Sequence, residues 1–300
     1  MSDLVRIHPD VAAALEAREP VVALETTLVS HGFPGLEGAE VARECEERVR
    51  AAGAVPATVG VLDGAVRVGL EPAELERFAA TTDARKVGPR DLAAAAVQGV
   101  VGATTVGGTL AACRFAGIGF LGTGGLGGVH RGFAETLDVS ADLGELTRTE
   151  ALVVASGAKS ILDVAATAEA LETLGVPVLG WRTDTIPRFY DARGGPPVSA
   201  RVESAEEAAS IAVAHWRLGR HSALLLARPP DESLDVEPLV EAGVAEAERQ
   251  GVKGQALTPF LLAYLHRESG GATIRVNRQL IVENASLAAE VAVAHAGLSG

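Results

Sequence analysis

The chain contains little cysteine: Cys45 and Cys113 are the two cysteines among 300 residues. Two cysteines cannot build a disulfide framework and their spacing matches no zinc site, so we interpret both as reduced residues of a cytoplasmic protein. The sequence has no histidine and cysteine cluster typical of zinc and no Gly-x-Ser-x-Gly motif typical of a hydrolase. Packing in the core is the simplest role for both thiols.

The chain also lacks an excess of positive charge. Its 26 lysines and arginines are outnumbered by 39 aspartates and glutamates, which gives a formal net charge of −13 and a pI near 5.0. Nucleic acids and anionic membranes select extended basic surfaces. We therefore expect no nucleic acid and no membrane as a partner, whereas a small anion is compatible with a local basic pocket.

Long apolar runs are absent as well. The N-terminal stretch MSDLVRIHPDVAAALEAREP contains acidic residues and no long apolar segment, so it does not indicate a signal peptide. Elsewhere, charges or turn-forming glycines interrupt every apolar stretch before it reaches the length of a membrane span. These absences favour a cytoplasmic location.

Aromatic residues make up 4% of the chain although 48% is hydrophobic, which indicates a core of Val, Leu, Ile and Ala. Short β-branched runs alternate with amphipathic stretches, the pattern of a sheet layered between helices. The predicted strands are PVVALET (20–26), TVGVLDGAVRVG (58–69), GIGFLGTGG (117–125), EALVVAS (150–156), VPVLGW (176–181) and SALLLARP (222–229). Asp63-Gly64 is a hairpin signal, so we predict an α/β fold with a mixed sheet.

The helix signals are ordinary starts and stops. One helix is predicted in residues 36–53, ending at Gly53. Ser160, with Asp163 in the capping-box position, is predicted to begin another, and Ser204 with Glu207 a third that ends near Arg217. We find no linker and no internal repeat, and therefore predict one domain over residues 1–300.

Lysine is scarce: Lys86, Lys159 and Lys253 are the lysines, and the other 23 basic residues are arginines. Lys159 follows a predicted strand and precedes a predicted helix, at the sheet edge where α/β proteins bind ligands. The helix dipole and partial burial both disfavour an ammonium there, and a neutral amine is a carbonyl nucleophile that arginine cannot replace. We therefore favour a covalent role for Lys159 over a solvated turn residue or a phosphate-binding charge. Lys253 we interpret as a surface residue.

Glu25 ends the predicted strand PVVALE. A partly buried carboxyl group at this position would have a raised pKa and could act as a general acid near neutral pH. A helix cap or a surface glutamate is the alternative.

Two glycine-rich segments are candidates for anion binding. Residues 119–132, GFLGTGGLGGVHRG, combine converging backbone amides with Thr123, His130 and Arg131, and residues 102–110, GATTVGGTL, are similar. Neither has the spacing of a P-loop or a dinucleotide motif, and tight packing explains the glycines equally well.

Two carboxylates follow the first glycine-rich segment. Asp138 and Asp142 are four residues apart in LDVSADL and share one face if this stretch is helical. Together they could hold a hard divalent cation. A solvated acidic turn is the alternative.

Five segments occur in an order that resembles the pseudouridine-5'-phosphate glycosidase family, also called indigoidine synthase A-like. They are ALETTLVSHGFP, VGVLDGAVRVG, GTGGLGGVHRG, DVSADL and GAKSILD, and the resemblance extends from about residue 8 to the C-terminal helix. It implies a three-layer α/β/α fold with a mixed, mostly parallel central sheet. It also implies a homotrimer with one Mn²⁺ per subunit, another divalent cation being possible.

The implied reaction is reversible cleavage of the carbon–carbon glycosidic bond of pseudouridine 5'-phosphate, giving uracil and ribose 5-phosphate. Lys159 matches the Schiff-base nucleophile, Glu25 the proton donor and Asp138 the metal ligand. The positions that match substrate contacts are Lys86, Val106, Thr123, His130, Ser140, Ala141, Asp142 and Asn284, with Asn277 as a competing match for the last.

The implied reaction explains why a lysine is needed. Uracil departs through its carbon C5, which is a poor leaving group, so the reaction needs an electron sink. A lysine amine bonded to carbon 1 of the ribose supplies this sink as an iminium. Two rival functions remain at this level. One is a C-glycosynthase that joins ribose 5-phosphate to another aromatic acceptor. The other is a non-catalytic nucleotide-binding module that uses only the glycine-rich loops.

Overall fold

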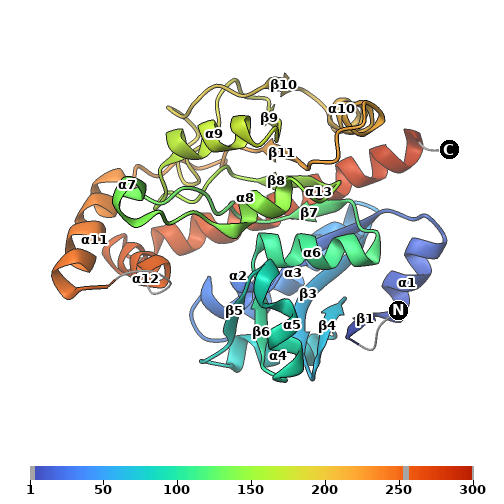
Figure 1. The fold of residues 1–300 in the computed structure, drawn as a ribbon, viewed down its shortest axis with the longest axis horizontal. Coiled ribbons are helices and arrows are strands. Elements are labelled where there is room, and N and C mark those ends of the chain that lie inside the picture. Colours follow the sequence, from blue (N-terminus) through green and yellow to red (C-terminus); the bar gives the residue numbers. More distant parts are fainter. Residues whose placement is uncertain (1–3, 253–256, 299–300) are drawn as a thin grey trace.

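The computed structural model describes residues 4–252 and 257–298, and its central element is an eleven-stranded mixed sheet (Figure 1). The strand order is β1-β4-β3-β2-β7-β8-β11-β9-β10, and β6 pairs with both β3 and β5. The strands are β1 Val5–Ile7, β2 Val21–Glu25, β3 Val55–Leu62, β4 Ala65–Val68, β5 Arg85–Val87, β6 Gly102–Thr104, β7 Phe120–Gly122, β8 Leu152–Ala155, β9 Val178–Trp181, β10 Ala200–Val202 and β11 Leu224–Ala227. Among the strand pairs in the described part of the chain, only β3–β4 and β3–β6 are antiparallel, so the predicted mixed, mostly parallel sheet is confirmed.

Helices cover both faces of this sheet. They are α1 Pro9–Glu16, α2 Thr27–His31, α3 Glu37–Ala51, α4 Pro72–Ala80, the 3-10 helix η1 Pro89–Asp91, α5 Leu92–Val97, α6 Val106–Ala116, α7 Phe133–Thr136, α8 Ala141–Leu146, α9 Val164–Thr173, α10 Ala205–Arg217, α11 Glu237–Gln250, α12 Leu257–Glu268 and α13 Ala272–Leu298. Within the described ranges, no helix combines the length and apolarity needed to cross a bilayer.

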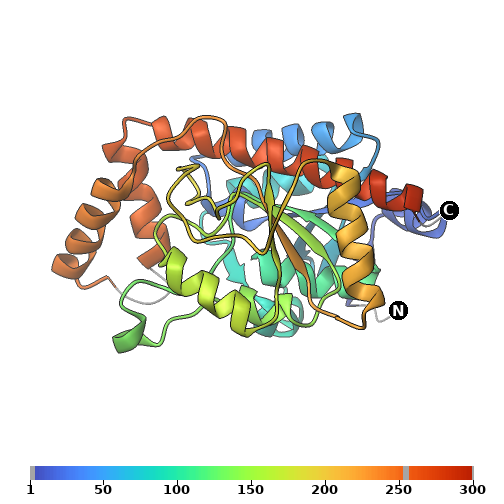
Figure 2. The same ribbon diagram turned by 90° about the horizontal axis from the view of Figure 1, so that it is seen from above.

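Alternation along the central strands produces the three layers. In β2, Val22 and Leu24 belong to the core under α3 and α13, whereas Val21 and Ala23 belong to the core under α6. Figure 2 shows α3 and α13 on one side of the sheet and α9 on the other. Since successive strand side chains point to opposite faces, an all-apolar strand is buried on both. The predicted α/β/α layering is confirmed.

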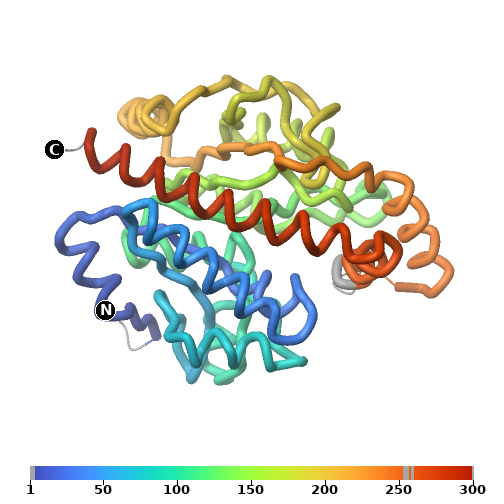
Figure 3. The backbone as a smooth tube through the Cα atoms, turned by 180° about the vertical axis from the view of Figure 1, so that it is seen from behind, coloured from blue at the N-terminus to red at the C-terminus, as the bar shows by residue number. Residues whose placement is uncertain are grey.

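The long helix α13 crosses one whole face of the sheet beside α3, as Figure 3 shows from behind. It packs on β2, β7 and β8, the strands that carry the site. Gly122 in β7 permits this close approach, because a Cβ there would lie 2.8 Å from the Cα of Ala285 in α13.

Local signals predicted several elements correctly. Every predicted strand segment contains a strand, and Asp63 and Gly64 form the hairpin turn with φ of 50° and 77°. Gly53 follows α3 with φ of 91°, and Ser204 caps α10 by accepting from the amide of Glu207. Sequence patterns missed β1, β5, β6 and β10.

One helix start was predicted wrongly. Helix α9 begins at Val164, and Asp163 is its cap, accepting from the amide of Ala166 at 2.9 Å. Ser160 is therefore not a capping residue, and Lys159 does not directly precede a helix N-terminus. The helix-dipole part of the argument for Lys159 is wrong for this reason.

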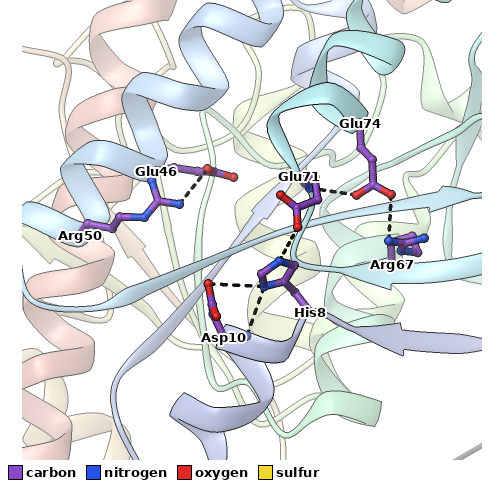
Figure 4. A network of polar contacts seen from close by, with 7 residues as sticks. All are labelled: His8, Asp10, Glu46, Arg50, Arg67, Glu71 and Glu74. Atoms are coloured by element: carbon purple, nitrogen blue, oxygen red, sulfur yellow. Dashed lines mark hydrogen bonds and ion pairs between the residues drawn. The ribbon is translucent and has the colours of Figure 1, made fainter.

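A polar network joins the first helix to the hairpin side of the sheet (Figure 4). His8 caps α1, and its Nε2 lies 2.8 Å from Oε1 of Glu71 at the start of α4. Glu74 accepts from the amide of Glu71 at 2.9 Å and pairs with Arg67 of β4 at 2.8 Å. These contacts fix α1 and α4 relative to each other.

Candidate active site

Three polar side chains meet at one edge of the sheet because β2, β7 and β8 are parallel neighbours. Glu25 is the last residue of β2, Thr123 directly follows β7, and Lys159 lies in the loop after β8. The carboxyl ends of parallel strands share an edge, which is where α/β folds bind ligands.

Glu25 is a buried carboxyl group with one free oxygen. Its side chain is 4% exposed, and the hydroxyl of Thr123 donates a hydrogen bond to Oε1. Oε2 has no hydrogen-bond partner. Burial raises the pKa of Glu25 more strongly than the charge of Lys159 lowers it. The group is suited to hold a proton and to deliver it from Oε2.

Lys159 is half-buried in a loop that is held by backbone contacts. Its amide donates to the carbonyl of Leu126 at 3.1 Å, which joins the loop to the glycine-rich segment. The guanidinium of Arg131 donates to the carbonyl of Ser160 at 3.1 Å and forms two hydrogen bonds with Glu237, of 2.6 and 3.0 Å. The backbone on both sides of Lys159 is therefore fixed while its side chain faces the pocket.

Lys86 approaches the same site from β5, at the other side of the pocket. It remains accessible to solvent, yet partial burial and the charge of Lys159 both lower the pKa of its ammonium. Two of the three lysines thus line one pocket. Lys253 lies outside the described residues.

The pocket has a volume of about 220 Å³ and is lined by two kinds of side chain. The polar members are Glu25, Thr27, His31, Lys86, Lys159 and Asn277. The apolar members are Leu28, Phe189, Leu262 and Ile281. A mostly apolar wall with a few converging polar groups is typical of a small-molecule site.

The glycine-rich segment forms one wall by close packing. Gly124 and Gly125 line the pocket, and a Cβ on Gly125 would lie 2.5 Å from the ring of Phe189. The amide of Gly127 donates to Asp142 at 3.0 Å and is not free for an anion. Tight packing, the alternative to anion binding, accounts for these glycines.

His130 and Asp138 lie beside this wall, with Nδ1 and Oδ2 4.0 Å apart. Burial lowers the pKa of His130, and the positive charges of Lys86 and Lys159 lower the same pKa further. The negative charge of Asp138 acts in the opposite direction. The two residues are therefore within electrostatic range of both lysines, although neither lines the pocket.

The condition for a shared helical face of Asp138 and Asp142 is not met, because α8 begins only at Ala141. Ser140 caps α8, and Ala141 is exposed. Asp142 is buried and accepts from the amides of Gly107 and Gly127, at 2.7 and 3.0 Å. Both of its oxygens therefore have protein donors.

Val106 begins α6, is fully buried and does not line the pocket. Asn284 is fully buried too, and its amide donates to the carbonyl of Thr123 at 2.8 Å. Asn277, about two turns earlier on α13, lines the pocket and has an Oδ1 without a hydrogen-bond partner. Of the two asparagines, Asn277 is therefore the one that faces the pocket.

A cation would find few protein ligands here. Among residues 4–252 and 257–298, no group of three His, Cys, Asp or Glu side chains is arranged to hold a metal. Asp138, with a side chain 39% exposed, offers one carboxylate and access to water. This fits a largely hydrated Mn²⁺ or Mg²⁺ and does not fit a cage of protein ligands.

Sequence reasoning assigned no role to His31, Phe189 or Leu262, all of which line the pocket. His31 stands in the segment ALETTLVSHGFP, so a histidine close to Glu25 in the chain was an available signal. Leu262 and Phe189 carried no local signal, because only the packing of α12 and of the segment after β9 brings them here.

The chain was compared with known proteins. A family described as "Indigoidine synthase A like protein" matches residues 10–294. The chain belongs to this family. A relative from Rhodospirillum centenum, named pseudouridine-5'-phosphate glycosidase, is 51% identical over 303 residues, covering 99% of this chain and 94% of the relative. One of the same name from Herpetosiphon aurantiacus is 48% identical over 293 residues, covering 96% and 97%.

A solved structure extends the family relation to the fold. The prealnumycin C-glycosynthase AlnA, in complex with ribulose 5-phosphate, superimposes with a TM-score of 0.91 at 40% identity. The match covers 100% of this chain and 99% of that one. The fold and family implied by the sequence resemblance are confirmed.

Proposed function

We propose that this protein is a pseudouridine-5'-phosphate glycosidase, which cleaves pseudouridine 5'-phosphate reversibly to uracil and ribose 5-phosphate. The observation that carries the proposal is the convergence of Glu25 and Lys159 on one pocket, a proton-holding carboxyl group beside a nucleophilic amine. The names of the relatives support the same substrate.

Glu25 acts first as a general acid. It gives its proton to the ring oxygen of the ribose as the bond between that oxygen and C1 breaks. The electron pair of the base nitrogen N1 moves through the ring to form a double bond between C5 and C1. A buried carboxyl group whose pKa is raised carries the required proton near neutral pH.

Lys159 then supplies the electron sink. Its free amine bonds to C1, the electron pair returns to N1, and the Glu25 carboxylate takes a proton from the attached nitrogen. That proton passes to C5 of the base. The bond between C1 and C5 then breaks as the nitrogen lone pair forms an iminium, and water finally releases ribose 5-phosphate from the lysine.

The remaining predicted residues bind the sugar phosphate and the base. Lys86 and His130 supply positive charge or donors for the phosphate, and Asp142 holds the start of α6 against the glycine-rich wall. Thr123 orients Glu25, and the backbone at Val106 and the segment from Ser140 to Ala141 complete the substrate site. Asn277 contacts the base, with Asn284 supporting the loop behind it.

We also propose one Mn²⁺ per subunit at Asp138, in a cytoplasmic homotrimer. The cation would supply a Lewis acid for a water or a carbonyl oxygen of the base. Metal analysis after exposure to Mn²⁺ should give one ion per chain, and Asp138→Asn should abolish it. Analytical ultracentrifugation should give three times the chain mass of 30.7 kDa.

The proposed chemistry is tested by borohydride trapping with ribose 5-phosphate. The protein is incubated with the sugar phosphate, reduced and digested, and the peptides are weighed by mass spectrometry. We expect a pentose phosphate adduct on the peptide that contains Lys159, and none after Lys159→Arg. The peptide that contains Lys253 serves as an internal control for non-specific reaction.

The outcome separates the enzyme from a binding module. Loss of both the adduct and uracil release in Lys159→Arg, with ribose 5-phosphate binding retained, supports the enzyme. Wild-type protein that binds the sugar phosphate without forming an adduct contradicts the covalent mechanism.

A C-glycosynthase is the second candidate, favoured by the 0.91 TM-score to a synthase of that class. It would use the same Glu25 and Lys159 with a different acceptor in the apolar part of the pocket. Competition between uracil and larger aromatic acceptors for ribose 5-phosphate decides between the two.

A further inference from the structure

Three residues that line the pocket carry unpartnered polar atoms. Among the described residues, buried side-chain atoms without a hydrogen-bond partner include Oε2 of Glu25, Nε2 of His31 and Oδ1 of Asn277. All three residues line the pocket. A buried polar group without a partner is unfavourable, and a ligand that completes its hydrogen bond removes this cost. The proposed mechanism uses Glu25 but gives His31 no role.

His31 presents a hydrogen-bond acceptor. Its ring is hydrogen-bonded to the backbone of Ala84. This contact raises the pKa of His31, so the ring is the donor. Since Nε2 has no partner, the donor is Nδ1. Burial and the charge of Lys86 lower the pKa of His31, so the ring is neutral at pH 7 and Nε2 carries a lone pair.

The position of His31 is fixed by its neighbours. Helix α2 is held at its start by Thr27, whose hydroxyl donates to the carbonyl of Thr104 at 2.7 Å. At its end, His266 of α12 is hydrogen-bonded to the backbone of Gly32. A ring that is hydrogen-bonded to Ala84 and carried on a helix held at both ends is suited to select a ligand by hydrogen-bond geometry.

The side of the pocket that holds His31 is suited to a flat heterocycle. Leu28 stands on α2 with His31, Leu262 on α12, and Asn277 and Ile281 on α13. The charged groups Lys86 and Lys159 come from β5 and from the loop after β8. The lysines attract the anionic sugar phosphate, and the apolar side chains together with the unpartnered atoms of His31 and Asn277 suit the base.

We propose that Nε2 of His31 accepts a hydrogen bond from a ring N–H of the base and so makes His31 a specificity-determining residue. This inference rests on the proposed function. A uracil linked through C5 has two ring N–H groups, at N1 and N3, whereas a uracil linked through N1 has one. An acceptor that faces N1–H therefore favours the carbon-linked nucleotide, whereas one that faces N3–H orients the base in either linkage.

The test combines variants with methylated substrates. Pseudouridine 5'-phosphate methylated at N1 or at N3 is compared with the parent for wild type, His31→Phe and His31→Gln. Loss of one hydrogen bond to a buried acceptor corresponds to a fall in kcat/KM of about tenfold to a hundredfold. We expect His31→Phe to show this fall on the parent and to be insensitive to methylation at one of the two nitrogens. His31→Gln, which keeps an acceptor, should recover part of the loss.

Two controls make the result decisive. Ribose 5-phosphate carries no base, so trapping at Lys159 should be unchanged in His31→Phe, and His221→Phe, at an exposed histidine, should resemble wild type. Equal sensitivity of wild type and His31→Phe to both methylations, or loss of trapping in His31→Phe, would overturn the inference. Failure of wild type to release uracil from the parent would instead overturn the proposed function.

Discussion

Replacing Glu25 with glutamine should abolish activity and remove a loss of stability that the wild type shows as the pH rises. The carboxyl group is 4% exposed, and burial raises its pKa above the ordinary value of 4.5. A group with a raised pKa in the folded state contributes stability that is complete below its unfolded pKa and is lost as the pH rises through the folded pKa. Glutamine does not titrate, so the variant lacks this loss.

The magnitude follows from the linkage between protonation and folding. Between pH 4.5 and the folded pKa, the wild type should lose about 1.4 kcal/mol of unfolding free energy per pH unit relative to Glu25→Gln. The variant should in addition be less stable by about 1–3 kcal/mol at every pH, because its new amide group stands where Oε2 has no partner and therefore finds no acceptor. The informative quantity is therefore the slope of the difference against pH.

Urea denaturation of both proteins across this pH range measures the difference directly. Glu40→Gln, at an exposed position on α3, controls for the loss of one negative charge. Glu25→Gln should also lose uracil release at every pH, since it has no proton to donate. A difference in unfolding free energy that stays constant with pH would refute the buried, protonated carboxyl group.

Two further substitutions test the loops around the site, and a third, in helix α8, is their control. Gly125→Ala should lower the free energy of unfolding by about 1–3 kcal/mol and reduce activity, because the new methyl group meets the ring of Phe189. Gly144→Ala, in open space on α8, should raise the free energy of unfolding by about 0.5–1 kcal/mol. Thermal denaturation measures both changes. Arg131→Met should cost about 1 kcal/mol and slow adduct formation about tenfold, because the carbonyl of Ser160 loses its donor. Stopped-flow or quenched trapping measures the rate, and an unchanged rate would show that the loop is held without Arg131.

The elements predicted correctly from the sequence are those with local causes. The apolar β-branched runs became buried strands, Asp63-Gly64 turned the hairpin because both residues tolerate positive φ, and Ser204 capped a helix through its own hydroxyl. Glu25 and the lysine loop could be placed at the sheet edge for the same reason, since Glu25 ends one obvious strand and the loop follows another.

The other elements depend on contacts between distant parts of the chain. The three-residue strands β5 and β6 exist through pairing, so no local pattern predicts that Lys86 stands on one of them. Ser160 matched a cap by spacing, but its carbonyl is bound by Arg131 and the helix begins after it.

The same distinction applies to the pocket. Local patterns were enough to predict the layered fold and to place Glu25 and Lys159 at the edge of the sheet, because strand patterns and residue chemistry are local. Asn277 and Asn284 lie on one helix and have the same chemistry, and only the packing of α13 against β7 turns the first toward the pocket and buries the second. The identity of the groups that face a ligand depended on contacts between residues far apart in the chain, which local sequence does not encode.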